Sequence, residues 1–482
     1  MIADLKPYPL MKDSGLPWLG EVPEHWGLKR GKNLFRCIDV RSSTGDEELL
    51  TVSSKRGVVP RRSATVTMFK AESYVGHKLC WPGDLVINSL WAWARGLGVS
   101  QFHGIVSTAY GVYRLRAEAH ADSRFIHELV RSTAFHWELQ VRSKGVWTSR
   151  LQLTDESFLG APFPLPALPE QSAIVRFLDH ADRRIRRYIR IRQKLIKLLE
   201  EQKQAIIHRA VTRGLDPNVL FKSSGVEWLG EVPEHWTLAR LKDAAVVQTG
   251  LTLGKNYKGV KTESRPYLRV ANVQVGRVDL KHVKYLDVPS NEANGATLRA
   301  GDVLMTEGGD IDKLGRGCVW RDEIPGCLHQ NHIFAVRCRK DVLSPEFLAG
   351  LMASLHGRAY FQLTAKQTTN LASTNSTTLR AFPVFLPPLP EQLTILDEIA
   401  RKTTGLAAAM GRAEHEIVLL REYRIRLIAD VVTGKLDVRA VAAKLPEEAD
   451  EPEPLDGAAA SAEGEDETED ADFDAVPEEA EA

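Results

Sequence analysis

Two stretches of thirteen residues decide the organisation of this chain: SGLPWLGEVPEHW at Ser14–Trp26 and SGVEWLGEVPEHW at Ser224–Trp236. Eleven of the thirteen positions are identical, which indicates a tandem repeat of one unit. The offset of 210 residues between the copies far exceeds the period of a solenoid repeat, which is about 20–50 residues. Each copy is therefore expected to be a domain with an appendage of its own.

Two further phrases return later in the chain. LPALPEQ at Leu165–Gln171 reappears as LPPLPEQ at Leu386–Gln392, and AVTRGLD at Ala210–Asp216 reappears as VTGKLD at Val432–Asp437. Both are offset by 221 residues, so the part before LPxLPEQ has changed length by 11 between the copies and the part after it has not. One part of the unit is held fixed while the other varies.

Length and composition place the chain among soluble globular proteins. At 482 residues it exceeds the size of a single core, so two to three domains are expected. No apolar run approaches a membrane span, and the first residues lack a signal pattern, so we expect a cytoplasmic protein. Five cysteines at wide spacing argue against a disulfide framework.

The formal net charge of zero hides a strong asymmetry. Residues 445–482 carry 17 Asp and Glu, and no Lys or Arg follows Lys444. This composition predicts a disordered acidic tail, because it cannot bury enough apolar surface to fold alone. Without these 17, 46 acidic residues face 63 basic ones, a net charge of +17. Such an excess is typical of a nucleic-acid partner; an ordinary solvated surface is the alternative.

The first LPEQ phrase predicts the start of a long helix. Proline is tolerated in a first helical turn, and Glu170 favours the positive end of the helix dipole. Gly214 is the next glycine or proline, so a helix of about 40 residues is expected. Its heptad seam comprises Ile174, Leu178, Ala181, Ile185, Tyr188, Leu195, Leu199 and Ile206, interrupted by Arg192 and Gln202.

The second LPEQ phrase predicts an equivalent helix, weakened early by Gly405 and Gly411. Its seam comprises Ile395, Ile399, Leu406, Ala409, Ala413, Ile417, Leu420, Leu427 and Val431, interrupted by Lys402 and Arg424. Two narrow apolar stripes need partners, so we predict that the helices form an antiparallel coiled coil. The alternative is that each helix folds back on its own domain.

The variable parts, residues 27–164 and 237–385, mix short β-branched or aromatic runs with turn residues and one helical stretch each. The predicted fold class is therefore α+β, with two mixed α/β domains joined by two long helices. The linker after the first helix looks like a C-terminal piece fused to an N-terminal piece. This predicts circular pseudo-twofold symmetry, in which residues near Ser14 and Asp437 lie together.

These repeated phrases and the two unlike domains between them resemble the DNA-specificity subunits of type I restriction-modification systems, up to about residue 440. The resemblance implies target-recognition domains at 1–167 and 214–388, the second including the linker. It also implies spacer helices at 168–213 and 389–440, followed by the acidic tail at 441–482, which departs from the family pattern.

The resemblance implies a non-catalytic subunit that recognises a bipartite, asymmetric sequence in double-stranded DNA. The spacer helices would set the distance between the two halves and bind two modification (methyltransferase) subunits, which restriction subunits join. No cofactor is implied for this chain; S-adenosylmethionine, ATP and Mg are implied for the partner subunits. Independently of the family, a rigid spacer holding two different readers suits two short sequences at fixed separation.

Side chains for reading DNA are expected in the variable parts, because Arg and Lys read guanine, Asn and Gln read adenine, and other basic residues hold phosphates. Two polar clusters at equivalent places, Ser143–Arg150 and Ala365–Leu371, are the most persuasive. The candidates in the first domain are Arg61, Arg62, Trp93, Arg95, Gln101, Lys144, Trp147, Ser149 and Arg150. Those in the second are Lys255, Asn256, Lys258, Arg269, Asn272, Lys313, Arg316, Gln330, Asn331, His332, Lys366, Gln367 and Asn370. For each of them the alternative is an ordinary solvated side chain, and Trp93 also fits a core position.

Catalytic motifs are missing from the sequence. It lacks an Asn/Asp-Pro-Pro-aromatic box and a Walker loop, and the Cys and His residues between Cys318 and Cys338 include no CxxC pair, so no metal site is predicted. The chain is therefore interpreted as a subunit without enzyme activity of its own. Two alternatives are a self-contained DNA methyltransferase or nuclease with an unrecognised site, and a coiled-coil scaffold that does not bind DNA.

Overall fold

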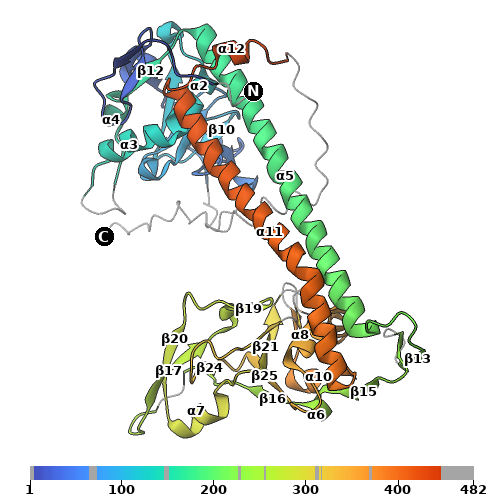
Figure 1. Ribbon diagram of the computed structural model, residues 1–482. Coiled ribbons are helices and arrows are strands. Elements are labelled where there is room, and N and C mark those ends of the chain that lie inside the picture. The colour runs from blue at the N-terminus through green and yellow to red at the C-terminus, as the bar shows by residue number, and fades with distance from the viewer. Residues whose placement is uncertain are drawn as a thin grey trace. The chain divides into compact units, whose positions relative to one another are not determined.

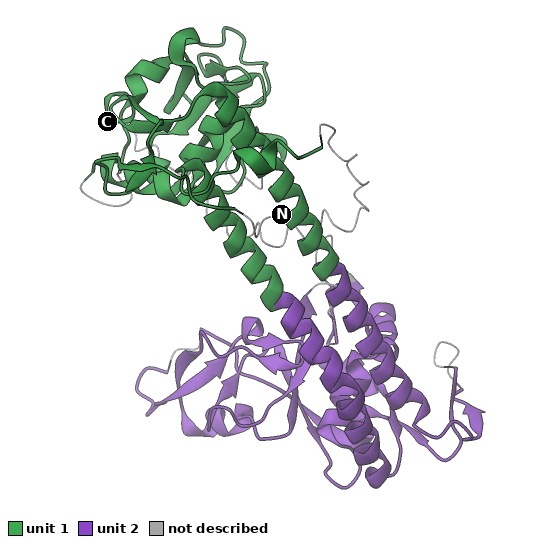
Figure 2. Ribbon diagram, turned by 45° about the horizontal axis from the view of Figure 1, so that its top comes forward, with its two compact units in different colours: residues 1–192, 415–482 green, residues 193–414 purple. Residues whose placement is uncertain are grey.

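The computed structural model describes residues 5–63, 73–145, 151–225, 230–254, 257–309, 314–315, 317–367 and 372–446. The chain divides into two compact units (Figure 2). Unit 1 comprises residues 1–192 and 415–482, and unit 2 comprises residues 193–414. We refer to residues 27–164 as the first head and to residues 237–385 as the second head.

A four-stranded antiparallel sheet in the order β4-β11-β8-β9 forms the centre of the first head. Its strands are β4 (Phe35–Cys37), β8 (Leu85–Asn88), β9 (Leu97–Val99) and β11 (Tyr110–Leu115). Antiparallel pairs join β5 (Leu50–Ser53) to β6 (Gly57–Pro60), and β7 (Lys78–Cys80) to β10 (Gly104–Val106). Outside the head, β1 (Met11–Asp13) pairs with β2 (Glu21–Pro23).

Short helices and a two-stranded ribbon complete unit 1. The ribbon pairs β3 (Gly27–Arg30) with β12 (Pro162–Leu165), which returns the chain to the long helix. The helices are α1 (Gly31–Leu34), α2 (Ser123–Arg131), α3 (Thr133–Arg142), α4 (Asp155–Leu159) and α12 (Arg439–Ala442), with 3-10 turns η2 (Arg61–Ser63), η3 (Ala92–Ala94) and η4 (Ala117–Ala119).

The second head repeats the central sheet as β16-β25-β21-β23, again antiparallel. Its strands are β16 (Ala245–Thr249), β21 (Asp302–Thr306), β23 (Gly317–Val319) and β25 (Ile333–Cys338). A separate sheet, β20-β17-β24, is built from β17 (Glu263–Leu268), β20 (Lys284–Val288) and β24 (Leu328–His329). The heads therefore share one sheet and differ in what is added to it.

The rest of unit 2 follows the plan of unit 1. Its two-stranded ribbons pair β13 (Phe221–Ser223) with β14 (Glu231–Pro233), β15 (Thr237–Arg240) with β28 (Pro383–Leu386), and β18 (Val273–Gln274) with β19 (Arg277–Val278). A small sheet orders β22 (Gly308–Gly309), β27 (Ala372–Ser373) and β26 (Lys366–Gln367). Its short helices are α6 (Leu241–Ala244), α7 (Ser290–Ala296), α8 (Pro345–Ala353), α9 (Leu355–Thr364) and α10 (Ser376–Ala381), with the 3-10 turn η7 (Val270–Asn272).

An ion pair occupies the same place in both central sheets. Asp84 accepts two hydrogen bonds from Arg114, at 2.7 and 2.8 Å, and Asp302 accepts two from Arg337, at 2.8 and 2.6 Å. These pairs make Arg337 the counterpart of Arg114. The buried aspartates fix this register, because a slip by one residue would remove each arginine from its carboxylate.

Each helical stretch in the heads is interrupted by a serine. The stretch Phe125–Leu139 belongs to two helices, α2 and α3, which meet at Ser132, and α8 and α9 meet at Ser354. The Ser132 hydroxyl donates to the Leu129 carbonyl and accepts from the Phe135 amide, so it ends one helix and caps the next. Serine competes with the helical backbone in this way, which a hydrophobic pattern does not reveal.

The two long helices are present: α5 spans Leu168–Arg213 and α11 spans Leu389–Val432 (Figure 1). In unit 1 Ile174, Leu178, Ala181 and Ile185 of α5 belong to one core with Leu427 and Val431 of α11. Asp182 contacts Arg424, and Arg192 contacts Glu416 at 2.5 Å. Residue numbers rise along α5 while they fall along α11, so the helices run antiparallel, as predicted.

The seam departs from the prediction at position 188. Tyr188 is exposed, and Ile189 packs against the core in its place. A straight helix of 3.6 residues per turn drifts from a strict heptad, which moves the buried position one residue on. Two interruptions of the seam, Arg192 and Arg424, form the ion pairs between the helices. In unit 2 Ala210 and Val211 share a core with Ile395.

The two ends of the described chain meet in unit 1. Lys6 and Asp437 form an antiparallel bridge, in which the Asp437 amide donates to the Lys6 carbonyl at 2.8 Å. This is the closure that the repeated phrases predict. The acidic tail from residue 447 lies outside the described residues. Within the described residues no helix is both long and apolar enough to cross a bilayer.

Candidate nucleic-acid interface

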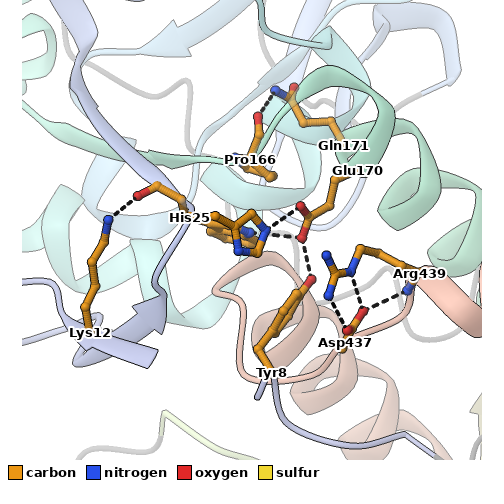
Figure 3. Close-up of polar contacts among 9 residues, drawn as sticks. Tyr8, Lys12, His25, Pro166, Glu170, Gln171, Asp437 and Arg439 are labelled. Atoms are coloured by element: carbon orange, nitrogen blue, oxygen red, sulfur yellow. Dashed lines mark hydrogen bonds and ion pairs between the residues drawn. The ribbon is translucent and has the colours of Figure 1, made fainter. Parts of the chain in front are cut away.

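The segment that leads into each head is fixed to the long helix through the glutamate of LPEQ. Glu170, in the first turn of α5, is buried and accepts hydrogen bonds from the Tyr8 hydroxyl at 2.6 Å and the Trp26 indole at 3.0 Å (Figure 3). His25 Nε2 lies 2.7 Å from its other oxygen. The tryptophan phrase and the LPEQ phrase therefore meet at one carboxylate, which we call the glutamate joint.

The second copy has the same joint with fewer contacts. The Trp236 indole donates to Glu391 at 3.0 Å, and His235 Nε2 lies 2.8 Å from its second oxygen. The side chain of Glu391 is 30% exposed, against 7% for Glu170. Unit 1 differs because the Tyr8 hydroxyl adds a third donor to the glutamate. Burial and the neighbouring Glu170 raise the pKa of Tyr8, so its hydroxyl stays protonated.

The glutamine of LPEQ extends each joint into the head. Gln171 accepts from the Asp122 amide at 2.7 Å and donates to the carbonyls of Pro166 at 2.8 Å and His120 at 3.1 Å. Gln392 repeats this with the Ser344 amide at 2.9 Å and the Val342 and Pro387 carbonyls. Asp122 and Ser344 cap α2 and α8, so each buried glutamine connects a long helix to the first helix of its head.

A partly buried arginine organises the loop before the first pair of candidates. Arg131, in the last turn of α2, donates to the carbonyls of Ser54 at 2.9 Å, Lys55 at 2.7 Å and Leu97 at 2.7 Å. Burial lowers the pKa of Arg131 to about 10. The turn between β5 and β6 is thereby held against β9. Sequence reasoning did not find Arg131, because nothing in the helix pattern distinguishes it from a surface arginine.

Arg61 and Arg62 follow this loop in η2. Arg62 is 82% exposed and lies 3.0 Å from Glu48, while Arg61 is half-buried. Arg56, which was not among the candidates, donates to the Ser63 carbonyl at 2.8 Å. The structure therefore gathers several cations on one hairpin.

Four further candidates of the first head come from other segments. Trp93 and Arg95 belong to the turn after β8, and Trp93 O lies 2.5 Å from His136 Nε2 on α3. Lys144 follows α3, is exposed, and pairs through its backbone with Gln152. The Trp93 indole donates to the Leu90 carbonyl, so this ring is committed to its turn. Gln101 is exposed after β9.

In the second head, hydrogen bonds bring Arg269, Gln330 and Asn331 together. The backbone N–H of Gln330 donates to the Leu268 carbonyl at 3.0 Å, and the side-chain oxygen of Gln330 accepts from the backbone N–H of Val270 at 3.3 Å. The backbone N–H of Asn331 donates to the Leu251 carbonyl. His332 Nδ1 lies 2.5 Å from Glu307. Lys258 and Lys366 are exposed, the latter on β26.

Asn272 is a structural residue of the second head. It is 4% exposed, its amide nitrogen donates to the Asp279 carbonyl at 2.8 Å, and its oxygen accepts from the Arg269 amide. It is therefore committed to the fold around η7. The remaining candidates lie outside the described residues: Trp147, Ser149, Arg150, Lys255, Asn256, Lys313, Arg316 and Asn370, together with the side chain of Gln367.

Known proteins are similar to parts of this chain in sequence. The EcoKI specificity subunit of Escherichia coli K12, a type I restriction enzyme, is 24% identical over 308 residues, covering 63% of this chain and 62% of the relative. The putative MjaX specificity subunit of Methanocaldococcus jannaschii is 24% identical over 207 residues, covering 42% and 47%. The chain is therefore similar in sequence to specificity subunits of type I restriction enzymes. It spans less than two thirds of the length of these two relatives.

A solved structure shares the fold of this chain. A chain from work on complex assembly and conformational transition of the type I R-M system has a TM-score of 0.58 at 18% identity. The match covers 85% of this chain and 98% of that one. Protein-family models give no match.

The three cysteines of the second head and His329 are core residues. Cys318, Cys327 and Cys338 are buried free thiols, and burial raises the pKa of each to about 12. His329 is buried, with Nδ1 2.9 Å from the Ala296 carbonyl. Among the described residues, no three His, Cys, Asp or Glu side chains are placed to hold a metal ion.

The glutamate joint makes a stability prediction. Glu170→Ala leaves three donors in unit 1 without their shared acceptor, so we expect it to lower the free energy of unfolding by about 3 kcal/mol. Glu391→Ala is expected to have a smaller effect, because Glu391 is more exposed and has one donor fewer. The exposed Glu24→Ala is the control, expected within about 0.5 kcal/mol of the unmodified chain. Urea unfolding measures all three; equal losses at Glu24 and Glu170 would contradict the role of the joint.

A second prediction concerns the stability of the chain at acidic pH. His127 on α2 accepts the Val99 amide at Nδ1 (3.1 Å), and burial lowers its pKa to about 4. The unfolded chain binds a proton there at about pH 6.5, so stability is full above that pH and falls as the pH drops towards 4, by up to about 3 kcal/mol. Urea unfolding at pH 7 and pH 4.5 should show a smaller acid loss in His127→Gln than in the unmodified chain. The exposed His415→Gln should retain the full loss.

Proposed function

We propose that this chain is a non-catalytic specificity subunit that recognises a bipartite, asymmetric sequence in duplex DNA, with one head reading each half. The observation that carries this proposal is the repeated glutamate joint. Two heads with the same central sheet are fixed in the same way to helices that continue from one unit into the other. A protein that recognises two different DNA sequences needs two different binding domains that are attached to the spacer helices in the same way.

The differences between the heads lie in the segments that carry the candidates. The first head adds the β5-β6 and β7-β10 pairs, and the second adds the β20-β17-β24 sheet. Arg61 and Arg62 follow β6, whereas Arg269 follows β17 and Gln330 follows β24. Exposed arginine and lysine side chains suit phosphates and guanine, and the side chain of Asn331 suits adenine. Asn272 is left out of this interface because its amide is committed within the head.

The same proposal assigns partners and cofactors. Two modification subunits that methylate adenine with S-adenosylmethionine would bind along α5 and α11, and restriction subunits that use ATP and Mg would join them in the cytoplasm. The names of the relatives, which are specificity subunits of type I restriction enzymes, support an assembly of this kind. The length of the paired helices would then set the number of base pairs between the half-sites.

Salt dependence tests the DNA interface. The purified chain should bind duplex DNA with an affinity that falls about 10³-fold or more between 50 and 200 mM salt, because six or more phosphate contacts release counterions. Lys144→Gln, in the first head, should reduce the slope of log affinity against log salt by about one if Lys144 holds a phosphate. Arg401→Gln is the matched control, because Arg401 is an exposed residue of α11 paired with Glu398. Fluorescence anisotropy measures each slope.

The outcomes separate the alternatives. Weak binding that does not depend on salt would favour a scaffold that does not bind DNA. Methylation or cleavage of the duplex by the purified chain alone would favour a self-contained enzyme. Either result overturns the proposal.

Exchange of one head tests the bipartite reading. When residues 27–164 are replaced by the corresponding segment of a related chain, one half of the methylated sequence should change and the other should stay the same. Mapping methylated adenines in a host that supplies the modification subunits measures this. A change in both halves would contradict independent readers.

A further inference from the structure

A stripe of arginines on α5 faces away from the helix pair. We define the arginine stripe as Arg183, Arg187 and Arg190, which follow the spacing of one helix face. At about 100° per residue, they lie roughly half a turn around the helix from the buried Leu178 and Ile185. Arg183 and Arg187 are exposed, and Arg190 is partly exposed. The stripe is therefore not part of the contact with α11.

The charges of the arginine stripe are not neutralised within the described part of the chain, where none of the three forms an ion pair or a side-chain hydrogen bond. The acids on the same stretch of α5 have other partners. Asp179 contacts Arg124, and Asp182 contacts Arg186 and Arg424. Three adjacent uncompensated cations on one face form a site for a polyanion.

The acidic tail leaves the folded part of unit 1 beside this stripe. Leu445 is buried in the core of unit 1, and the Arg176 guanidinium donates to the Leu445 carbonyl and, at 3.5 Å, to the Pro446 carbonyl. Arg176 is exposed on α5, seven residues before Arg183, and so lies on the same face of the helix. The short helix α12, which precedes Leu445, lies beside the first turns of α5 (Figure 1).

The distances allow the tail to reach the stripe. At 1.5 Å per residue, Arg183 lies about 10 Å and Arg190 about 21 Å along the helix from Arg176. An extended chain spans up to about 3.3 Å per residue, so Asp450 can reach Arg183 and Glu453 can reach Arg190. The tail from residue 447 carries 17 acidic residues and no basic one. The point where the tail is attached, the length that it can span and its negative charge therefore all suit binding to the arginine stripe.

We propose that the acidic tail, residues 447–482, docks on the arginine stripe of α5. The tether raises the effective concentration of the tail at the stripe to the millimolar range without any new contact. Exposed ion pairs are weak singly and are screened within about 8 Å at physiological salt, so docking depends on many acids acting together and weakens as salt rises. Under the DNA-binding function proposed above, a docked tail competes with duplex phosphates for the stripe.

A photo-cross-linking experiment on the full chain tests the docking. p-Benzoylphenylalanine replaces Ile191, which is 50% exposed and lies four residues after Arg187 on the same face. Because no Lys or Arg follows Lys444, trypsin releases the tail as one peptide, and mass spectrometry identifies its adduct with α5. We expect an intramolecular adduct at 20 mM salt, with a yield at least five-fold lower at 500 mM salt.

Two triple variants show whether the stripe itself is the site. Arg183→Gln, Arg187→Gln and Arg190→Gln together should reduce the adduct at least five-fold. The matched control removes the same charge from exposed residues of the same unit, with Arg30→Gln, Lys32→Gln and Arg36→Gln, and should leave the yield within two-fold. Circular dichroism confirms that both variants fold. An equal loss in both, or no adduct in the unmodified stripe, overturns the proposal.

Two further readouts separate the remaining occupants. An adduct found only in cross-linked dimers, with a yield that rises with protein concentration, would mean that the tail of a second copy occupies the stripe, and this overturns intramolecular docking. Addition of duplex DNA should lower the intramolecular yield several-fold. If the yield does not change while the chain binds DNA, docking stands and the competition is rejected. Failure to bind DNA at all bears on the proposed function and leaves the adduct as the test of docking.

Discussion

The architecture depends on one pair of side chains, a glutamate and a glutamine, at the start of each long helix. These pairs are Glu170 with Gln171, and Glu391 with Gln392. The glutamate binds the indole and imidazole of the preceding tryptophan phrase, and the glutamine binds backbone groups of the head. A buried carboxylate with two or three donors has a narrow choice of geometry, because each unused donor is costly. The heads can therefore diverge in their loops while their attachment stays the same.

The two joints are not equal, and the reason lies in chain connectivity. In unit 2 the segment that carries Trp236 continues covalently from the end of α5. In unit 1 the equivalent connection is made by contacts: the Lys6 bridge to Asp437, and Arg439 5.0 Å from the ring of Tyr8. Tyr8, which donates to Glu170, adds to this closure. The extra hydrogen bond appears in the unit that lacks the covalent link.

Sequence reasoning predicted what is periodic or repeated. It found both long helices, their antiparallel pairing, and the closure between the chain ends, because these follow from hydrophobic spacing and from phrases that occur twice. It placed Tyr188 in the seam, where Ile189 packs, because a strict heptad ignores the drift of a straight helix. It gave Glu170 a role in the helix dipole only, although His25–Trp26 and Glu170 recur together in both copies.

The heads were less accessible from the sequence, because their loops have no period. Asn272 fits the pattern of a base-reading amide, yet its hydrogen bonds hold η7 together. Arg131 is indistinguishable from a solvated arginine until the loop carbonyls of Ser54 and Lys55 are in place around it. Whether a polar side chain faces solvent or the backbone depends on contacts distant in the chain, which a list of residue types does not contain.

The core of unit 1 has a consequence for protein synthesis. Trp26 and Phe125 share that core with Leu427, Val438 and Leu445, which are made more than 280 residues later. The first head therefore emerges from the ribosome without part of the apolar surface that completes its interior. The second head needs no segment beyond α11, so it can finish folding while the first still waits for its last pieces. A nascent chain of this protein exposes its earliest residues for longest, and these residues depend most on chaperones that shield apolar surface.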